Sequence, residues 1–205
     1  DALSSKDKTK KSKLNLRINS IILRRVNVAY NERYAPLTPG KFNPKHLSVS
    51  RINTNISLKS ITNEAINLRI RSLSFHEASG LQVNNLHFKL YASKTEAHIE
   101  DFYLEMPHTH INQGQLIASY DIRKGFSSLL PTLRIGATTN KMQISTTDLQ
   151  PFVNFPKGMN LTLNLSSTFL LTPQKWQFSQ LNITDTENKL SLKGNVTIDH
   201  RGKAF

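Results

Sequence analysis

The sequence contains no cysteine. This absence excludes a disulfide framework, a thiolate metal site and a cysteine nucleophile. It also contains no run of about 18 consecutive apolar residues, the length that a membrane-spanning helix needs. The sequence opens at Asp1 without a signal-peptide pattern and ends shortly after an alternating segment, so we expect it to be an internal piece of a longer protein.

Motifs for common catalytic chemistry are missing as well. The eight glycines are scattered and form no phosphate-binding loop, and no G-x-S-x-G nucleophile motif occurs. Glu100 and Asp101 are adjacent in an alternating segment, so their side chains would point to opposite faces and could not act as an acid–base pair. We therefore predict no catalytic residue and a protein that is not an enzyme.

The histidines are the remaining candidates for a metal site. His108 and His110 would lie on one face of an extended segment, which is a workable ligand spacing. Pro107 marks a strand end beside them, and no third ligand follows at a recognisable interval. The prediction is that they are surface histidines, with no metal and no cofactor.

Apolar residues are also scarce. They make up 38% of the chain, and counting the eight Gly while leaving out the five Tyr gives roughly 39%, below the ~45–50% of compact domains. Ser, Thr and Asn are plentiful instead. Such a balance fits a sheet with one wetted face, or a thin elongated body, better than a thick α/β core.

What the sequence does have is alternation with a period of two residues, the signature of half-buried strands. The alternating segments are 14–18, 26–30, 52–58, 68–75, 86–90, 99–106, 111–120, 133–135, 142–144, 161–165, 169–171, 176–183 and 190–198. Proline and glycine mark residues 33–44 as a loop. The only helical signal is a short turn near 147–153, with Thr146 or Thr147 as its N-cap.

The chain also resembles itself at two places. Residues 14–21 match residues 66–73 at Asn, Leu, Arg, Ile and Ser, and residues 99–104 echo residues 178–183. We predict an all-β fold: an elongated, curled, mostly antiparallel sheet of around a dozen strands in repeated units, with an apolar concave face and very little helix. This β-repeat region would cover residues 14–205, with a subdivision near 121–132.

The formal net charge is +13, and part of it lies in residues 1–13, which we predict to be a disordered basic lead-in. This segment is either a solvated linker or a polybasic stretch near anionic lipid. A basic protein attracts phosphate in general, yet no RNA-recognition motif, helix-turn-helix or zinc finger is present. Nucleic-acid binding is therefore the least favoured function.

The apolar strand faces are the informative feature, because something must cover them: a second sheet, the curled sheet itself or an apolar ligand. If the cover is a ligand, the alternating apolar residues would line a groove; if it is protein, the same residues form a closed core. The groove candidates are Leu14, Leu16, Ile18, Leu86, Phe88, Leu90, Leu161, Leu163 and Leu165.

Three segments resemble the AsmA-like/TamB family of cell-envelope proteins in its Bacteroidetes form. They are residues 18–47, which contain Pro36-Leu37-Thr38-Pro39-Gly40, residues 70–86 and residues 144–153. Together with the paired strands from 161 to 198 they cover most of residues 14–200. The family's membrane anchor and C-terminal domain are not among them, so the resemblance is to an internal, N-terminal-side fragment.

The resemblance implies a periplasmic β groove in a protein anchored to the inner membrane outside this fragment. It implies phospholipid acyl chains as cargo, and a BamA/TamA-like barrel of the outer membrane as partner, in lipid transport or protein assembly. A scaffold that binds unfolded outer-membrane proteins by strand augmentation is the alternative function.

Overall fold

In the computed structural model of the protein, residues 14–156, 158–187 and 189–199 are described. The lead-in predicted for residues 1–13 lies outside the described residues. Of the described part, 66% is strand and 6% is helix, which confirms the all-β prediction.

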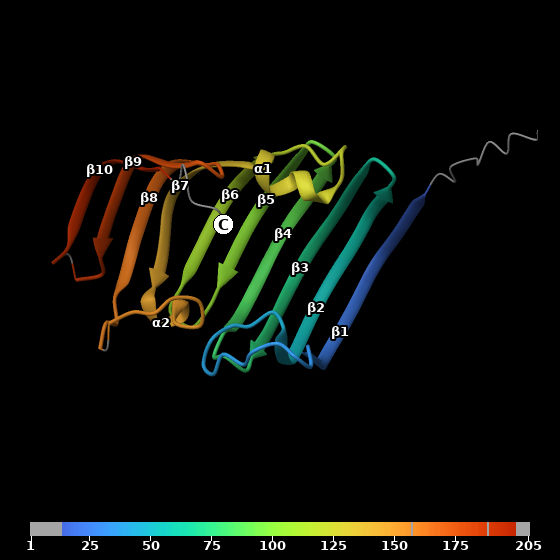
Figure 1. The fold of residues 1–205 in the computed structure, drawn as a ribbon, viewed down its shortest axis with the longest axis horizontal. Helices are drawn as coiled ribbons and strands as arrows, with labels where there is room; N and C mark the ends of the chain where they lie inside the picture. The colour runs from blue at the N-terminus through green and yellow to red at the C-terminus, as the bar shows by residue number, and fades with distance from the viewer. Residues whose placement is uncertain (1–13, 157, 188, 200–205) are drawn as a thin grey trace, which may run out of the picture.

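Ten strands form a single antiparallel sheet in which spatial order equals chain order (Figure 1). The strands are β1 (Asn15–Asn31), β2 (His46–Thr62), β3 (Ala65–Glu77), β4 (Gln82–Ser93), β5 (Glu96–Glu105), β6 (His110–Ser119), β7 (Arg134–Ser145), β8 (Thr162–Leu171), β9 (Lys175–Asp185) and β10 (Ser191–Asp199). Most connections are short, and short connections favour antiparallel neighbours. The result is a meander without a second sheet layer in the described residues.

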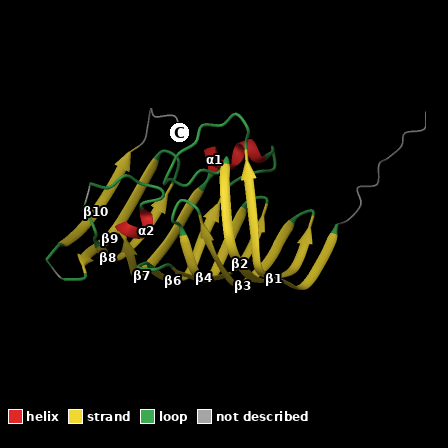
Figure 2. Cartoon of the chain, turned by 90° about the horizontal axis from the view of Figure 1, so that it is seen from below, coloured by secondary structure: helices red, strands yellow, loops and turns green. Residues whose placement is uncertain are grey.

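Three helical turns lie outside the sheet, in two of its longer connections (Figure 2). They are η1 (Phe126–Ser128), α1 (Leu129–Thr132) and α2 (Thr146–Leu149). The segment 121–132, where a subdivision was predicted, contains η1 and α1. β6 precedes this segment and β7 follows it, and the two strands pair with each other, so the sheet is continuous from β6 to β7.

The number of strands is smaller than the dozen expected, for a simple reason. Segments 14–18 and 26–30 both belong to β1, segments 133–135 and 142–144 to β7, and segments 161–165 and 169–171 to β8. Register shifts interrupt the alternation inside all three strands. An extra residue in one strand of a pair bends it and moves the following side chains to the other phase without ending the strand.

These bulges also explain the two internal echoes in the sequence. In the first, the register shifts between Ile18 and Ile21 of β1 and between Ile70 and Leu73 of β3. In the second, the matched residues Asp101 and Gln180 both have a positive φ of 53°. The repeated unit is therefore a strand with a bulge in its middle.

The left-handed residues in the strands need partners for their amides, because a bulge removes them from the regular ladder. Asn side chains on neighbouring strands supply several of these partners. Asn53 Oδ1 accepts from the Arg25 amide at 3.1 Å, and Asn27 Oδ1 accepts from the Arg51 amide at 3.0 Å. Across β9 and β10, Asn195 Oδ1 accepts from the Gln180 amide at 2.9 Å.

The predicted helical turn differs from the structure in its cap. Neither Thr146 nor Thr147 is the N-cap of α2: the cap is Ser145, whose hydroxyl accepts from the Thr147 amide. Thr146 already lies inside the turn, and its hydroxyl accepts from the Leu161 amide at 2.9 Å. A long-range contact thus engages the side chain that the local sequence pattern favours as a cap.

Replacing Asn27 by Ala tests this capping of the bulges. The Arg51 amide loses its partner, so we expect the free energy of unfolding to fall by about 1 kcal/mol. Asn19→Ala is the matched control, since Asn19 is an exposed residue of the same strand, and it should change stability by less than about 0.5 kcal/mol. Urea unfolding measures both; equal losses would contradict the role of Asn27.

Candidate functional site: an open apolar trough

The cross-strand register places the apolar residues on one face of the sheet, because directly opposed residues in antiparallel strands share a face. One row of opposed residues crosses all ten strands without a polar member. This first apolar row is Leu16, Ile61, Ile66, Ala92, Ala97, Ala118, Ile135, Leu171, Trp176 and Ile198. At about 4.8 Å per strand it spans roughly 40 Å.

A second row crosses the ten strands further along, with one hydroxyl residue in it. This second apolar row is Leu23, Thr54, Leu73, Leu86, Leu104, Ile111, Met142, Leu165, Ile183 and Leu192. Both rows belong to the same face, since β4 alternates regularly from Leu86 through Phe88 and Leu90 to Ala92. The strands thus join into one apolar surface.

The register brings seven of the nine predicted groove residues onto this face. Leu16 lies in the first row, Leu86 and Leu165 lie in the second, and Leu163 is two residues from Leu165 on the same strand. The remaining three lie between the two rows: Ile18 and Leu90 in a run through Leu58 and Leu68, and Phe88 opposite Ile70.

The other two predicted residues lie just outside the strands. Leu14 precedes β1 and Leu161 precedes β8. The Leu14 amide donates to Asn63 Oδ1 at 3.4 Å, and the Leu161 carbonyl accepts from the Thr146 amide at 2.9 Å. They flank the apolar face at the ends of its strands and belong to no cross-strand row.

Protein covers this face only in part. Among the described residues, the buried apolar side chains are Val83, Met106 and Leu181, each 6% exposed. Leu16, Leu23 and Trp176 remain 42%, 39% and 38% exposed. A contiguous apolar surface of this length is uncommon on a soluble protein unless something binds to it.

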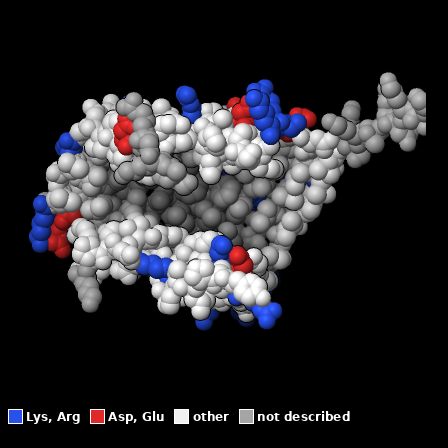
Figure 3. Space-filling view, in the orientation of Figure 1, with Lys and Arg blue, Asp and Glu red and all other residues white. Residues whose placement is uncertain are grey.

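The sheet curls, so that the apolar face becomes the floor of a trough. Figure 3 looks into this hollow, where charged side chains gather on the walls and ends and are almost absent from the floor. The charged strand residues lie on the opposite face: Arg69, Lys89 and Glu100, for example, form a row of their own. The two faces therefore have different chemistry.

Loops at the strand ends form the walls. The connection between β1 and β2 contacts the one between β7 and β8, although four strands separate β2 from β7 in the sheet. The Phe42 amide donates to the Pro151 carbonyl at 2.9 Å, Lys41 Nζ donates to the Val153 carbonyl at 3.0 Å, and the Phe42 and Phe152 ring centroids are 5.4 Å apart. This contact makes one wall of the trough continuous.

The wall turns are fixed by buried carboxylates. Glu77, which is 6% exposed, accepts from the Ser48 amide and from the amide and hydroxyl of Ser79. Asp185 Oδ1 accepts from the Leu190 amide at 2.9 Å. Asp148, which is also buried, accepts from the His108 amide at 2.8 Å and lies 3.2 Å from the His108 ring nitrogen Nδ1.

The two histidines that were considered as metal ligands have different surroundings. His108 lies in a turn against Asp148, whereas His110 begins β6 opposite Gln143. Within the described residues, no group of three His, Cys, Asp or Glu side chains is placed to hold a metal ion. No helix of the described part is long and apolar enough to cross a membrane.

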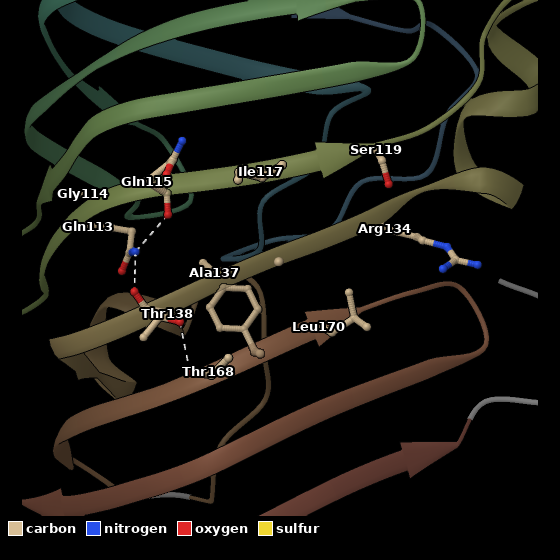
Figure 4. Close-up of a pocket in the computed structure, with 12 residues that line it drawn as sticks. Gln113, Gly114, Gln115, Ile117, Ser119, Arg134, Ala137, Thr138, Thr168 and Leu170 are labelled. Carbon is tan, nitrogen blue, oxygen red and sulfur yellow. Dashed lines mark hydrogen bonds between the residues drawn. The ribbon is translucent and has the colours of Figure 1, made fainter.

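The seam between β6 and β7 has a pocket that sequence patterns did not indicate. The two strands pair near both of their ends. In the middle, Gln113 Nε2 donates to the Thr138 carbonyl at 2.8 Å (Figure 4). A shallow pocket of about 670 Å³ opens there, lined by Ile117, Leu170 and Arg134 among others. It contains no catalytic arrangement of side chains.

No family model, no curated protein and no solved structure matches this chain.

Placing a charge on the floor of the trough distinguishes an open face from a closed core. For Phe88→Lys and Leu163→Lys we expect a stability loss of no more than about 2 kcal/mol, because the ammonium group can reach water. The control Leu181→Lys puts a charge at a buried site and should cost several kcal/mol. Thermal unfolding followed by circular dichroism measures all three; collapse of the first two would show that the face is a closed core.

The Glu77 turn predicts a dependence of stability on pH. Burial raises the pKa of this carboxyl, but hydrogen bonds from Ser79, Ser48 and Ala78 outweigh burial and hold the pKa below its ordinary 4.5. The ionised form is favoured in the folded protein, so its contribution is present above pH 4.5 and is lost as the pH falls through the lowered pKa.

We expect Glu77→Gln to lower the free energy of unfolding by about 1 kcal/mol at neutral pH and by progressively less in acid. The control is Glu100→Gln, an exposed strand residue. Urea unfolding across the acid range gives both differences. A Glu77→Gln deficit that stays constant with pH would contradict the role of the ionised carboxylate.

Proposed function

We propose that this chain is a segment of an AsmA/TamB-like envelope protein whose trough carries phospholipid acyl chains. The observation that supports this most is the first apolar row, which runs through all ten strands without a polar side chain. An acyl chain lying along such a floor would meet apolar side chains at every strand spacing.

The energetics of the floor suit transport better than storage. Each methylene group withdrawn from water gains about 0.8 kcal/mol. The floor offers similar Leu, Ile and Ala contacts at successive strands, so a chain that slides by one strand exchanges one contact for an equivalent one. Weak repeated contacts of this kind allow movement along the roughly 40 Å of the trough.

The role is non-enzymatic in this proposal, and the remaining expectations follow the family resemblance. The full-length protein would be anchored in the inner membrane through a segment outside this chain and would cross the periplasm. A BamA/TamA-like barrel protein of the outer membrane would be its partner there.

A second candidate function, capture of unfolded outer-membrane strands, is supported by the edges of the sheet. Within the described residues, β1 and β10 are each hydrogen-bonded to a neighbour on one side only. Unpaired edges are templates for strand addition. This function would use backbone groups of the edges and would be indifferent to the floor of the trough.

Lipid content of the purified chain tests the proposal. Native mass spectrometry of the wild-type protein should show bound phospholipid, and Phe88→Lys and Leu163→Lys should lose most of it. Ile22→Lys is the matched control, because Ile22 lies opposite Asn55, off the apolar rows, and is 55% exposed; it should keep the lipid. Absence of lipid from the wild type, or equal lipid in every variant, would refute the conduit and leave the edges as the candidate site.

A further inference from the structure

Charge is distributed unevenly over the face of the sheet opposite the trough. The proposed lipid conduit does not explain this uneven distribution. Residues 14–77 contain ten Lys and Arg but three acidic residues, a net charge of +7, whereas residues 78–205 have twelve against nine, a net charge of +3. The excess therefore lies on β1, β2 and β3. The basic patch consists of Arg17, Arg24, Arg25, Arg51, Lys59, Arg69 and Arg71.

All seven side chains of the basic patch are exposed. None of them forms an ion pair or a side-chain hydrogen bond within the described part of the chain. The three acidic residues of this region are engaged elsewhere: Glu32 pairs with Lys45, Glu64 pairs with Lys94, and Glu77 is buried in its turn. Within the described residues, Asp101 on β5 is close enough to Arg69 for their charges to attract, and the patch as a whole keeps an excess of positive charge.

The register brings three of these residues close together: Arg17, Lys59 and Arg69. Arg69 lies opposite Ser57 on β2, two residues from Lys59, while Arg17 falls between the pairs that join Leu16 to Ile61 and Ile18 to Leu58. Neighbouring strands are about 4.8 Å apart, well within the screening length of about 8 Å in physiological salt. The positive charges therefore reinforce one another.

The patch ends at a defined boundary. Arg69 lies opposite Lys89 on β4, and Lys89 Nζ is 2.7 Å from Asp101 Oδ2 on β5. From β5 onward, acidic residues such as Glu96 and Glu100 balance the basic ones. Like charges on adjacent strands destabilise a sheet, so the excess of cations on the first three strands does not stabilise the fold.

We propose that the basic patch docks the first three strands against a bilayer surface rich in anionic phospholipid headgroups. This inference is independent of the trough, since the patch lies off the apolar rows. Charge complementarity favours a phosphate-bearing partner, and Ile22, exposed on the same strands, offers an aliphatic side chain to the interface. A basic surface with an exposed aliphatic side chain suits a headgroup layer.

Nucleic acid fits the patch less well. Proteins that bind single strands stack bases on aromatic side chains. The aromatic residues of β1–β3 are Tyr30 and Phe75, and both lie opposite aliphatic residues, Leu47 and Val83 respectively. The patch thus provides positive charge without a stacking surface.

Vesicle binding tests this inference. The patch variant is Arg17→Gln, Lys59→Gln and Arg69→Gln together; the control variant is Lys124→Gln, Lys141→Gln and Lys193→Gln, which removes the same charge at exposed sites outside the patch. Cosedimentation is measured with vesicles of phosphatidylcholine alone and of phosphatidylcholine mixed with phosphatidylglycerol. Circular dichroism checks that both variants fold.

The wild type should bind only the anionic vesicles, and more weakly as salt is raised. Three basic residues near a charged surface correspond to an affinity loss on the order of a hundredfold in the patch variant, and the control variant should lose much less. The patch variant changes no residue of the apolar rows, which separates this test from that of the trough.

Three outcomes would overturn the inference. An equal loss of vesicle affinity in the patch variant and the control variant would show that binding depends on net charge and not on the patch. Unchanged binding by the patch variant would place the contact elsewhere. Patch-dependent binding to duplex DNA by a wild-type protein that ignores the vesicles would assign the surface to nucleic acid.

Discussion

Hydrogen bonding between neighbouring strands is the interaction on which the whole structure depends. In a sandwich, a second sheet would bury the apolar face and share the stabilisation with this ladder. Here three apolar side chains of the described residues are buried, so most apolar contacts are lateral ones within a single layer. Each strand depends on the strands beside it, as in repeat proteins whose units are stabilised by adjacent units.

A single layer can keep its apolar residues together only if the strands remain in phase over their full length. Twist and bulges would otherwise send side chains to the wrong face. Here the bulges occur in corresponding strand regions, and the apolar residues resume on the same face after each one, as at Ile70 and Leu73. Arg25 and Arg51 have a left-handed backbone, and Asn side chains accept the hydrogen bonds of their amides.

This regularity is why much of the fold could be predicted from the sequence. A period of two residues identifies strands and the residues that share a face, and short polar turns predict a meander. The face of Leu86, Phe88 and Leu90 follows from that period alone. Bulges were harder to predict, because a residue such as Asp101 or Gln180 has no side-chain signature for a positive φ.

Other features depend on contacts between distant parts of the chain. The cap of α2 is Ser145, since Thr146 is engaged by Leu161, and the wall contact of Lys41 with Val153 joins residues 112 positions apart. Alternation tells which side chains share a face but not what covers them. The trough is open because no other part of the described chain forms a covering layer, and no local sequence pattern encodes this.

A one-layer architecture leaves both faces of the same strands available for different partners. Along β1, Leu16 and Ile18 belong to the trough, while Arg17 between them belongs to the basic patch. Successive side chains of a strand point to opposite faces, so neighbouring residues serve separate surfaces without sharing a contact. The apolar rows continue through all ten strands, whereas the basic patch is confined to the first three. The trough is thus nearly equivalent from strand to strand, and the charged face alone distinguishes one end of the sheet from the other.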